Sequence, residues 1–114
     1  MIATELWQQF GNLTYQDIPE SSRLVAKQCL LDWMGCAIAG SREPLADILK
    51  AEFAEVRGNC SIIGSNQKTT AQTAALLNGA IGHALDFDDT HTTMGGHPSV
   101  PVAPAVLAMG EQLN

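Results

Sequence analysis

The sequence TTAQTAALLNGAIG, residues 69–82, predicts a helix at the centre of this protein. Thr69 is followed three residues later by Gln72, a spacing typical of a capping box at the start of a helix. The side chains that recur along the next turns are small: Ala71, Ala74, Ala75, Asn78, Gly79 and Gly82. A helix with such a narrow surface lets a neighbouring helix approach closely, so we expect other helices to pack against this one.

The flanking sequence predicts four further helices. Their expected ranges are 4–10, about 19–39, 44–56, and from Pro98 towards Gln112. In the second of these, the buried stripe is predicted from residues that recur at helical spacing, namely Leu24, Leu31, Met34 or Gly35, and Ile38.

Only one segment of the sequence suggests a strand. Cys60–Gly64 is short and follows Gly58, which is a natural stop for the preceding helix. The predicted fold class is therefore all-α, with about five helices and at most a very short strand near Cys60–Gly64.

Composition and charge exclude several classes of protein. The chain has 114 residues, of which 46% are hydrophobic and 16% charged, so it can bury a modest core and is not a disordered tail. The net charge of −6 argues against nucleic acid or an anionic membrane as the main partner. All six basic residues precede Thr69, namely Arg23, Lys27, Arg42, Lys50, Arg57 and Lys68. An anion bound after Thr69 must therefore find its positive charge elsewhere.

The cysteines and apolar runs point to a cytoplasmic protein. Three cysteines without a CxxC pair suggest neither a disulfide framework nor a zinc knuckle. The first residues lack the pattern of a secretory signal. No apolar run reaches the roughly 18 residues of a membrane helix, so we expect no membrane association.

The residues that carry chemistry are concentrated in HALDFDDTHTTMGGHPS, residues 83–99. His83 and Asp86 are three residues apart, and Thr90 follows Asp86 by four, so these side chains can share a face at the end of a helix. The glycines at 95–96 then free the backbone to turn before His97. A loop between two helix ends, lined with titratable groups, is a common way to build a pocket.

Three interpretations of this segment remain open from the residues alone. A histidine and an aspartate can form a general acid/base pair that moves a proton next to a carboxylate. The same residue types can instead cap helix ends or lie satisfied on the surface. They also suit Mg²⁺, Mn²⁺ or Zn²⁺, although the spacing of Asp88 and Asp89 is poor for a magnesium-diphosphate site.

Two stretches of this sequence resemble the signatures of a known enzyme family. HALDFDDTH at 83–91, followed by GHPSVPVAPA at 96–105, looks like the hallmark motif of the MmgE/PrpD family. LLDWMGCAIAGS at 30–41 resembles its second hallmark, and NGA at 78–80 also fits. The family includes 2-methylcitrate dehydratase and cis-aconitate decarboxylase.

The resemblance implies a large helical domain joined to a smaller α/β lid domain, in a homodimer. It implies chemistry on small di- and tricarboxylates without a metal and without another cofactor. Asp86, Thr90 and His97 fall on the family's active-site positions. By this resemblance His97 is an acid/base or carboxylate-binding group, Thr90 a hydrogen-bonding contact to substrate, and Asp86 an orienting or proton-handling carboxylate.

Members of that family are several times longer than this chain, and further active-site residues come from downstream. We therefore expect residues 1–114 to be the N-terminal portion of the helical domain, inactive as a dehydratase or decarboxylase alone. A segment of a larger domain leaves apolar faces uncovered, so the small-residue stripe of 71–82 and the last helix are expected to be exposed and to drive association. The alternative is a non-catalytic helical module for binding or assembly.

Overall fold

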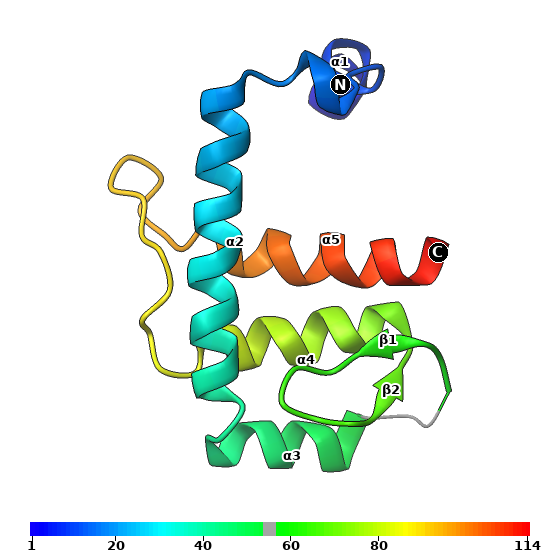
Figure 1. The fold of residues 1–114 in the computed structure, drawn as a ribbon, viewed down its shortest axis with the longest axis vertical. Coiled ribbons are helices and arrows are strands. Elements are labelled where there is room, and N and C mark those ends of the chain that lie inside the picture. Colours follow the sequence, from blue (N-terminus) through cyan, green and yellow to red (C-terminus); the bar gives the residue numbers. More distant parts are fainter. Residues whose placement is uncertain (54–56) are drawn as a thin grey trace.

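The computed structural model describes residues 1–53 and 57–114, and within them the protein is mostly α-helical (Figure 1). The elements follow in the order α1 (Ile2–Phe10), a 3₁₀ turn η1 (Tyr15–Asp17), α2 (Glu20–Gly40), α3 (Pro44–Phe53), β1 (Cys60–Ser61), β2 (Lys68–Thr69), α4 (Ala71–His83) and α5 (Ser99–Leu113). The all-α prediction is confirmed. Val56, which the sequence placed at the end of the third helix, lies outside the described residues. No helix in the described part of the chain is long and apolar enough to cross a membrane.

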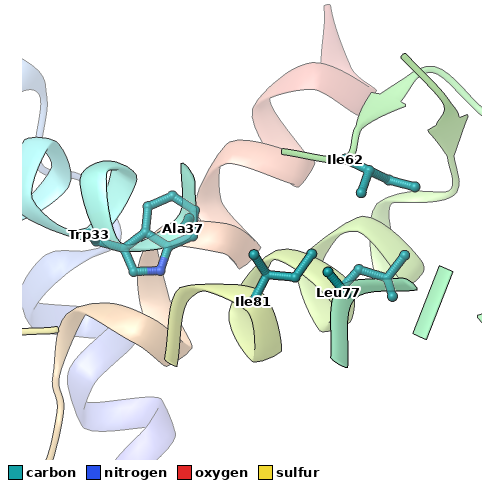
Figure 2. Packing of buried hydrophobic residues seen from close by; sticks show 6 residues of the cluster. Trp33, Ala37, Ile62, Leu77 and Ile81 are labelled. Atoms are coloured by element: carbon teal, nitrogen blue, oxygen red, sulfur yellow. The ribbon is translucent and has the colours of Figure 1, made fainter. Parts of the chain in front are cut away.

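Helix α4 is the centre of the fold, as its small side chains predict. It packs against α5 along its length, against α2 near its C-terminal end, and against α3 on another side (Figure 1). The core cluster takes Leu77 and Ile81 from α4, Trp33 and Ala37 from α2, and Ile62 from the segment after β1 (Figure 2). The N-cap of this helix was predicted one residue too early. Thr69 pairs with Cys60 in the small antiparallel sheet, and Thr70 is the residue that caps α4.

The prediction of the buried stripe of α2 is wrong except at Met34, which is partly buried against the core. Leu24, Leu31 and Ile38 are 57%, 75% and 53% exposed, whereas the buried residues of this helix are Trp33, Ala37 and Gly40. Apolar residues occur all around α2, so spacing alone does not identify the face that packs. The face with small residues is the one that can approach α4 closely, since a methyl group on Gly40 would clash with the backbone carbonyl of residue 81.

The expectation of uncovered apolar faces is half correct. Val102, Val106 and Met109 of α5 are exposed, as expected for the last helix. The small-residue stripe of α4 is not uncovered, because Ala74 and Gly82 are buried under α5 and α2. Helix α1 has no buried residue and lies at the end of the molecule away from α3 (Figure 1).

The small sheet is tied to α5 through one carboxylate. The backbone N–H of Ser61 donates to Glu111 Oε2 at 2.6 Å, the Ser61 hydroxyl donates to Oε1, and Lys68 Nζ lies 3.8 Å from Oε1. The hydrogen bonds from the Ser61 hydroxyl and N–H, with the charge of Lys68, hold the pKa of Glu111 below its ordinary value. Because the folded pKa is the lower one, this stabilisation is complete above the unfolded pKa and is lost as pH falls through the folded pKa.

Glu111→Gln is therefore expected to lower the free energy of unfolding at pH 7 by about 1 kcal/mol, a modest value because the side chain is 39% exposed and screened by solvent. Urea denaturation at pH 7 and at acidic pH measures it, and the difference between the two proteins should shrink in acid. Glu52→Gln, which removes the same charge from an exposed side chain, is the control. Equal losses in the two variants would show that the contact with Ser61 contributes nothing.

Candidate active site

The candidate site lies in the loop between α4, which ends at His83, and α5, which begins at Ser99. Asp86 adopts a left-handed backbone conformation with φ of 55°, and its N–H bonds to the carbonyl of His83 at 3.0 Å. Aspartate tolerates this conformation better than most residues that carry a Cβ. Further along, the N–H of His91 bonds to the carbonyl of Gly96 at 2.9 Å, which closes residues 91–96 into a compact turn. The loop is thus folded back so that His97 returns to the end of α4.

Asp88 contacts both histidines of the site. Its side chain is inaccessible to solvent, and its Oδ1 lies 2.8 Å from His83 Nδ1. Its Oδ2 is 3.2 Å from His97 Nδ1, and its backbone carbonyl is also 3.2 Å from that nitrogen. The two imidazole rings meet edge to face, with centroids 4.6 Å apart. One buried residue therefore touches two titratable rings.

The other ring nitrogen of His97 faces a second carboxylate. His97 Nε2 lies 3.4 Å from Asp86 Oδ1. The Asp86 side chain is 78% exposed, while that of His97 is 25% exposed. The imidazole of His97 is thus held between a buried carboxylate and an exposed one, an arrangement that can accept a proton and pass it on.

The contact with Asp88 also changes the charge of His83. The hydrogen bond to the Asp88 carboxylate raises the pKa of His83, and partial burial only partly opposes it. A larger share of His83 therefore carries a positive charge near neutral pH than of an ordinary histidine. This charge lies in a part of the chain that contains no lysine or arginine after residue 68.

The structure brings together two of the three residues singled out by the sequence. Asp86 and His97 are neighbours, whereas Thr90 is exposed and no side-chain hydrogen bond to it is found among the described residues. The capping interpretation applies to Asp89, whose carboxylate accepts from the N–H of Ser99 at 3.1 Å and from its hydroxyl at 2.6 Å. This bond anchors the start of α5 to the loop.

Sequence reasoning missed the role of Asp88 and gave none to His83. They lie five residues apart, a spacing that matches neither helix nor strand periodicity, so no pattern connects them. The available signal was their membership of the same dense cluster of histidines and aspartates.

The same cluster offers ligand atoms for a cation. One atom from each of His83, Asp86, Asp88 and His97 lies within 4.8 Å of the others. Both Nδ1 atoms already face Asp88, so an ion would either displace these contacts or bind through the Nε2 atoms.

The amino-acid sequence as a whole belongs to a known family of proteins. The chain matches the MmgE/PrpD N-terminal domain over residues 5–114, and it is therefore a member of the MmgE/PrpD family. It is 35% identical over 112 residues to the cis-aconitate decarboxylase-like protein oryM of Aspergillus oryzae, covering 96% of this chain and 23% of that protein. It is 34% identical over 114 residues to the cis-aconitate decarboxylase of Aspergillus terreus, covering 98% of this chain and 23% of that enzyme. The chain thus spans about a quarter of the length of these relatives.

Proposed function

We propose that this chain supplies part of the active site of a lyase or isomerase that performs metal-independent acid/base chemistry on a small di- or tricarboxylate. The observation that carries the proposal is the imidazole of His97, held between the carboxylates of Asp86 and Asp88. Dehydration, decarboxylation and epimerisation of such substrates all require a positioned group that exchanges a proton near a carboxylate. In this proposal the protein works in the cytoplasm as a homo-oligomer.

The roles follow from which atoms are free. A carbonyl oxygen can only accept, so the Nδ1 of His97 donates to Asp88 and the Nε2 is the atom that exchanges a proton with substrate. Asp86, 3.4 Å from this Nε2, shares the proton and orients the ring. The exposed hydroxyl of Thr90 is proposed to hydrogen-bond the substrate.

The site needs additional positive charge to bind a polycarboxylate substrate. Asp86, Asp88 and Asp89 repel a polycarboxylate, and His83 alone offers too little positive charge to hold one. We propose that the lysine or arginine side chains that bind the substrate come from a region corresponding to the remainder of the relatives' length. The site is then complete only in the larger assembly.

This division predicts that the 114-residue chain alone gives no measurable turnover. A chimera in which it replaces the matching segment of the Aspergillus terreus cis-aconitate decarboxylase is expected to release CO₂ from cis-aconitate. Both proteins are also assayed for loss of water from 2-methylcitrate, and circular dichroism checks that each is folded. Turnover by the chain alone would contradict the shared site, and a folded but inactive chimera would contradict the proposed chemistry.

A second candidate, a non-catalytic helical module for binding or assembly, is favoured by the exposed apolar side chains of α2 and α5 such as Leu31, Val102 and Val106. Apolar surface of this kind marks contacts with another protein surface. The chimera separates the two candidates, because a pure binding module would restore no turnover.

A further inference from the structure

The burial of Asp88 stands in contrast to the exposure of the groups around it. Its side chain has no contact with solvent, while the His83 side chain is 46% exposed and that of Asp86 is 78% exposed. A carboxylate removed from water is costly unless polar partners compensate it. The hydrogen-bonding partner here is His83, whose Nδ1 donates to Oδ1. Oδ2 lies 3.2 Å from the His97 ring nitrogen but has no hydrogen-bond partner within the described residues.

These contacts dictate the tautomer of each ring. The groups that face the two Nδ1 atoms are a carboxylate and a backbone carbonyl, and neither can donate a hydrogen bond. Each Nδ1 must therefore carry the proton, which leaves each Nε2 directed away from Asp88. For His97 that atom meets Asp86, and for His83 no partner of Nε2 is found within the described residues.

We infer that Asp88 is the positioning residue of this site: it holds His83 and His97 as one unit whose Nε2 atoms both face the substrate. Asp88 itself is too buried to touch a substrate and acts only through the rings. The two rings have different tasks. His97 exchanges the proton with Asp86 beside it, and His83, whose pKa the same carboxylate raises, offers a positive charge to a substrate carboxylate. This inference rests on the proposed function in one respect, namely that the two rings face the substrate.

Nuclear magnetic resonance of the histidine ring nitrogens tests the inference on the 114-residue chain without any activity. In the unchanged chain both His83 and His97 are expected as the Nδ1–H tautomer when neutral, with a protected Nδ1–H proton. In Asp88→Asn the pKa of His83 is expected to fall towards that of an exposed histidine and the Nδ1–H preference of this ring should be lost, whereas His97 keeps its Nδ1–H contact with the backbone carbonyl of residue 88. Asp88→Glu is expected to restore part of both signatures.

Asp89→Asn is the matched control, because it removes the same charge one residue away from a carboxylate bonded to Ser99 instead of the histidines. It is expected to leave the His83 titration and both tautomers unchanged. The inference is overturned if Asp88→Asn behaves as this control does. Should Asp88→Asn fail to fold, the unchanged chain still decides the matter, since an Nε2–H tautomer at either ring contradicts the proposed role.

In the chimera, Asp88→Asn is expected to lower kcat about 100-fold with a smaller change in KM, because misplacing a reacting group by about 1 Å has effects of that size. The ring-tautomer measurement and the chimera assay can fail independently of each other. An inactive chimera with the expected ring tautomers would remove the proposed function and leave the positioning contacts standing. An active chimera in which either ring is the Nε2–H tautomer would contradict the positioning role of Asp88 and leave the proposed function standing.

Discussion

Replacing His97 with alanine in the chimera is expected to reduce kcat for cis-aconitate by about 10²- to 10⁴-fold, the usual contribution of a positioned general acid or base. The His97 ring is the group that joins the buried Asp88 to the exposed Asp86. The Asp86 carboxylate, which is already 78% exposed, then lacks the imidazole that shares its proton. Steady-state kinetics of the purified chimera measures the loss.

His91→Ala provides the matched control for this prediction. His91 lies in the same loop, but it is exposed and its Nδ1 accepts a hydrogen bond from the backbone N–H of Met94. We expect the replacement of His91 to change kcat far less than the replacement of His97 does.

Asp86→Asn should also lower kcat, because an amide cannot take up a proton from the His97 ring. Unchanged turnover in both His97→Ala and Asp86→Asn would remove the assignment of this site.

The sequence indicated which residues form the site better than it indicated the contacts between them. The motif around Asp86 and His97 identified two groups that the structure places 3.4 Å apart. It did not identify Asp88 as the residue between the histidines, because that contact depends on the left-handed turn at Asp86 and the closed loop of residues 91–96. Such contacts depend on the path of a loop, which has no periodicity for a sequence pattern to report.

The helices were predictable for a different reason. Capping residues, glycines and prolines mark helix ends locally, so α2 and α5 begin and end within a residue or two of their expected limits. Which face of a helix is buried depends on its neighbours. In α2 the spacing of Leu31 and Ile38 predicted one face, whereas α4 packs on the face of Ala37 and Gly40 because small residues permit a closer approach.

Trp33→Ala is expected to lower the free energy of unfolding of this chain by more than Glu111→Gln does. Trp33 is fully buried in the core with Leu77 and Ile81, and its indole lies so close to Gly82 that a methyl group there would clash with it. Truncating a buried tryptophan costs about 3–5 kcal/mol. The indole N–H has no hydrogen-bond partner among residues 1–53 and 57–114, so its removal returns about 1 kcal/mol of desolvation cost. A net loss of roughly 2–4 kcal/mol follows, because the lost packing outweighs the relieved N–H.

Trp7→Ala is the control for this loss, since it makes the same change on α1, where the side chain is 73% exposed. Its effect on the free energy of unfolding is expected to stay within about 0.5 kcal/mol. Urea denaturation followed by circular dichroism compares the two variants, and equal losses would show that the contact of α2 with α4 does not hold the fold together.

The contact of Trp33 with α4 also affects the candidate site, because Gly82 immediately precedes His83. If Trp33 fixes the end of α4, then Trp33→Ala must also weaken the hydrogen bond between His83 and Asp88, and the pKa of His83 should fall in that variant but not in Trp7→Ala.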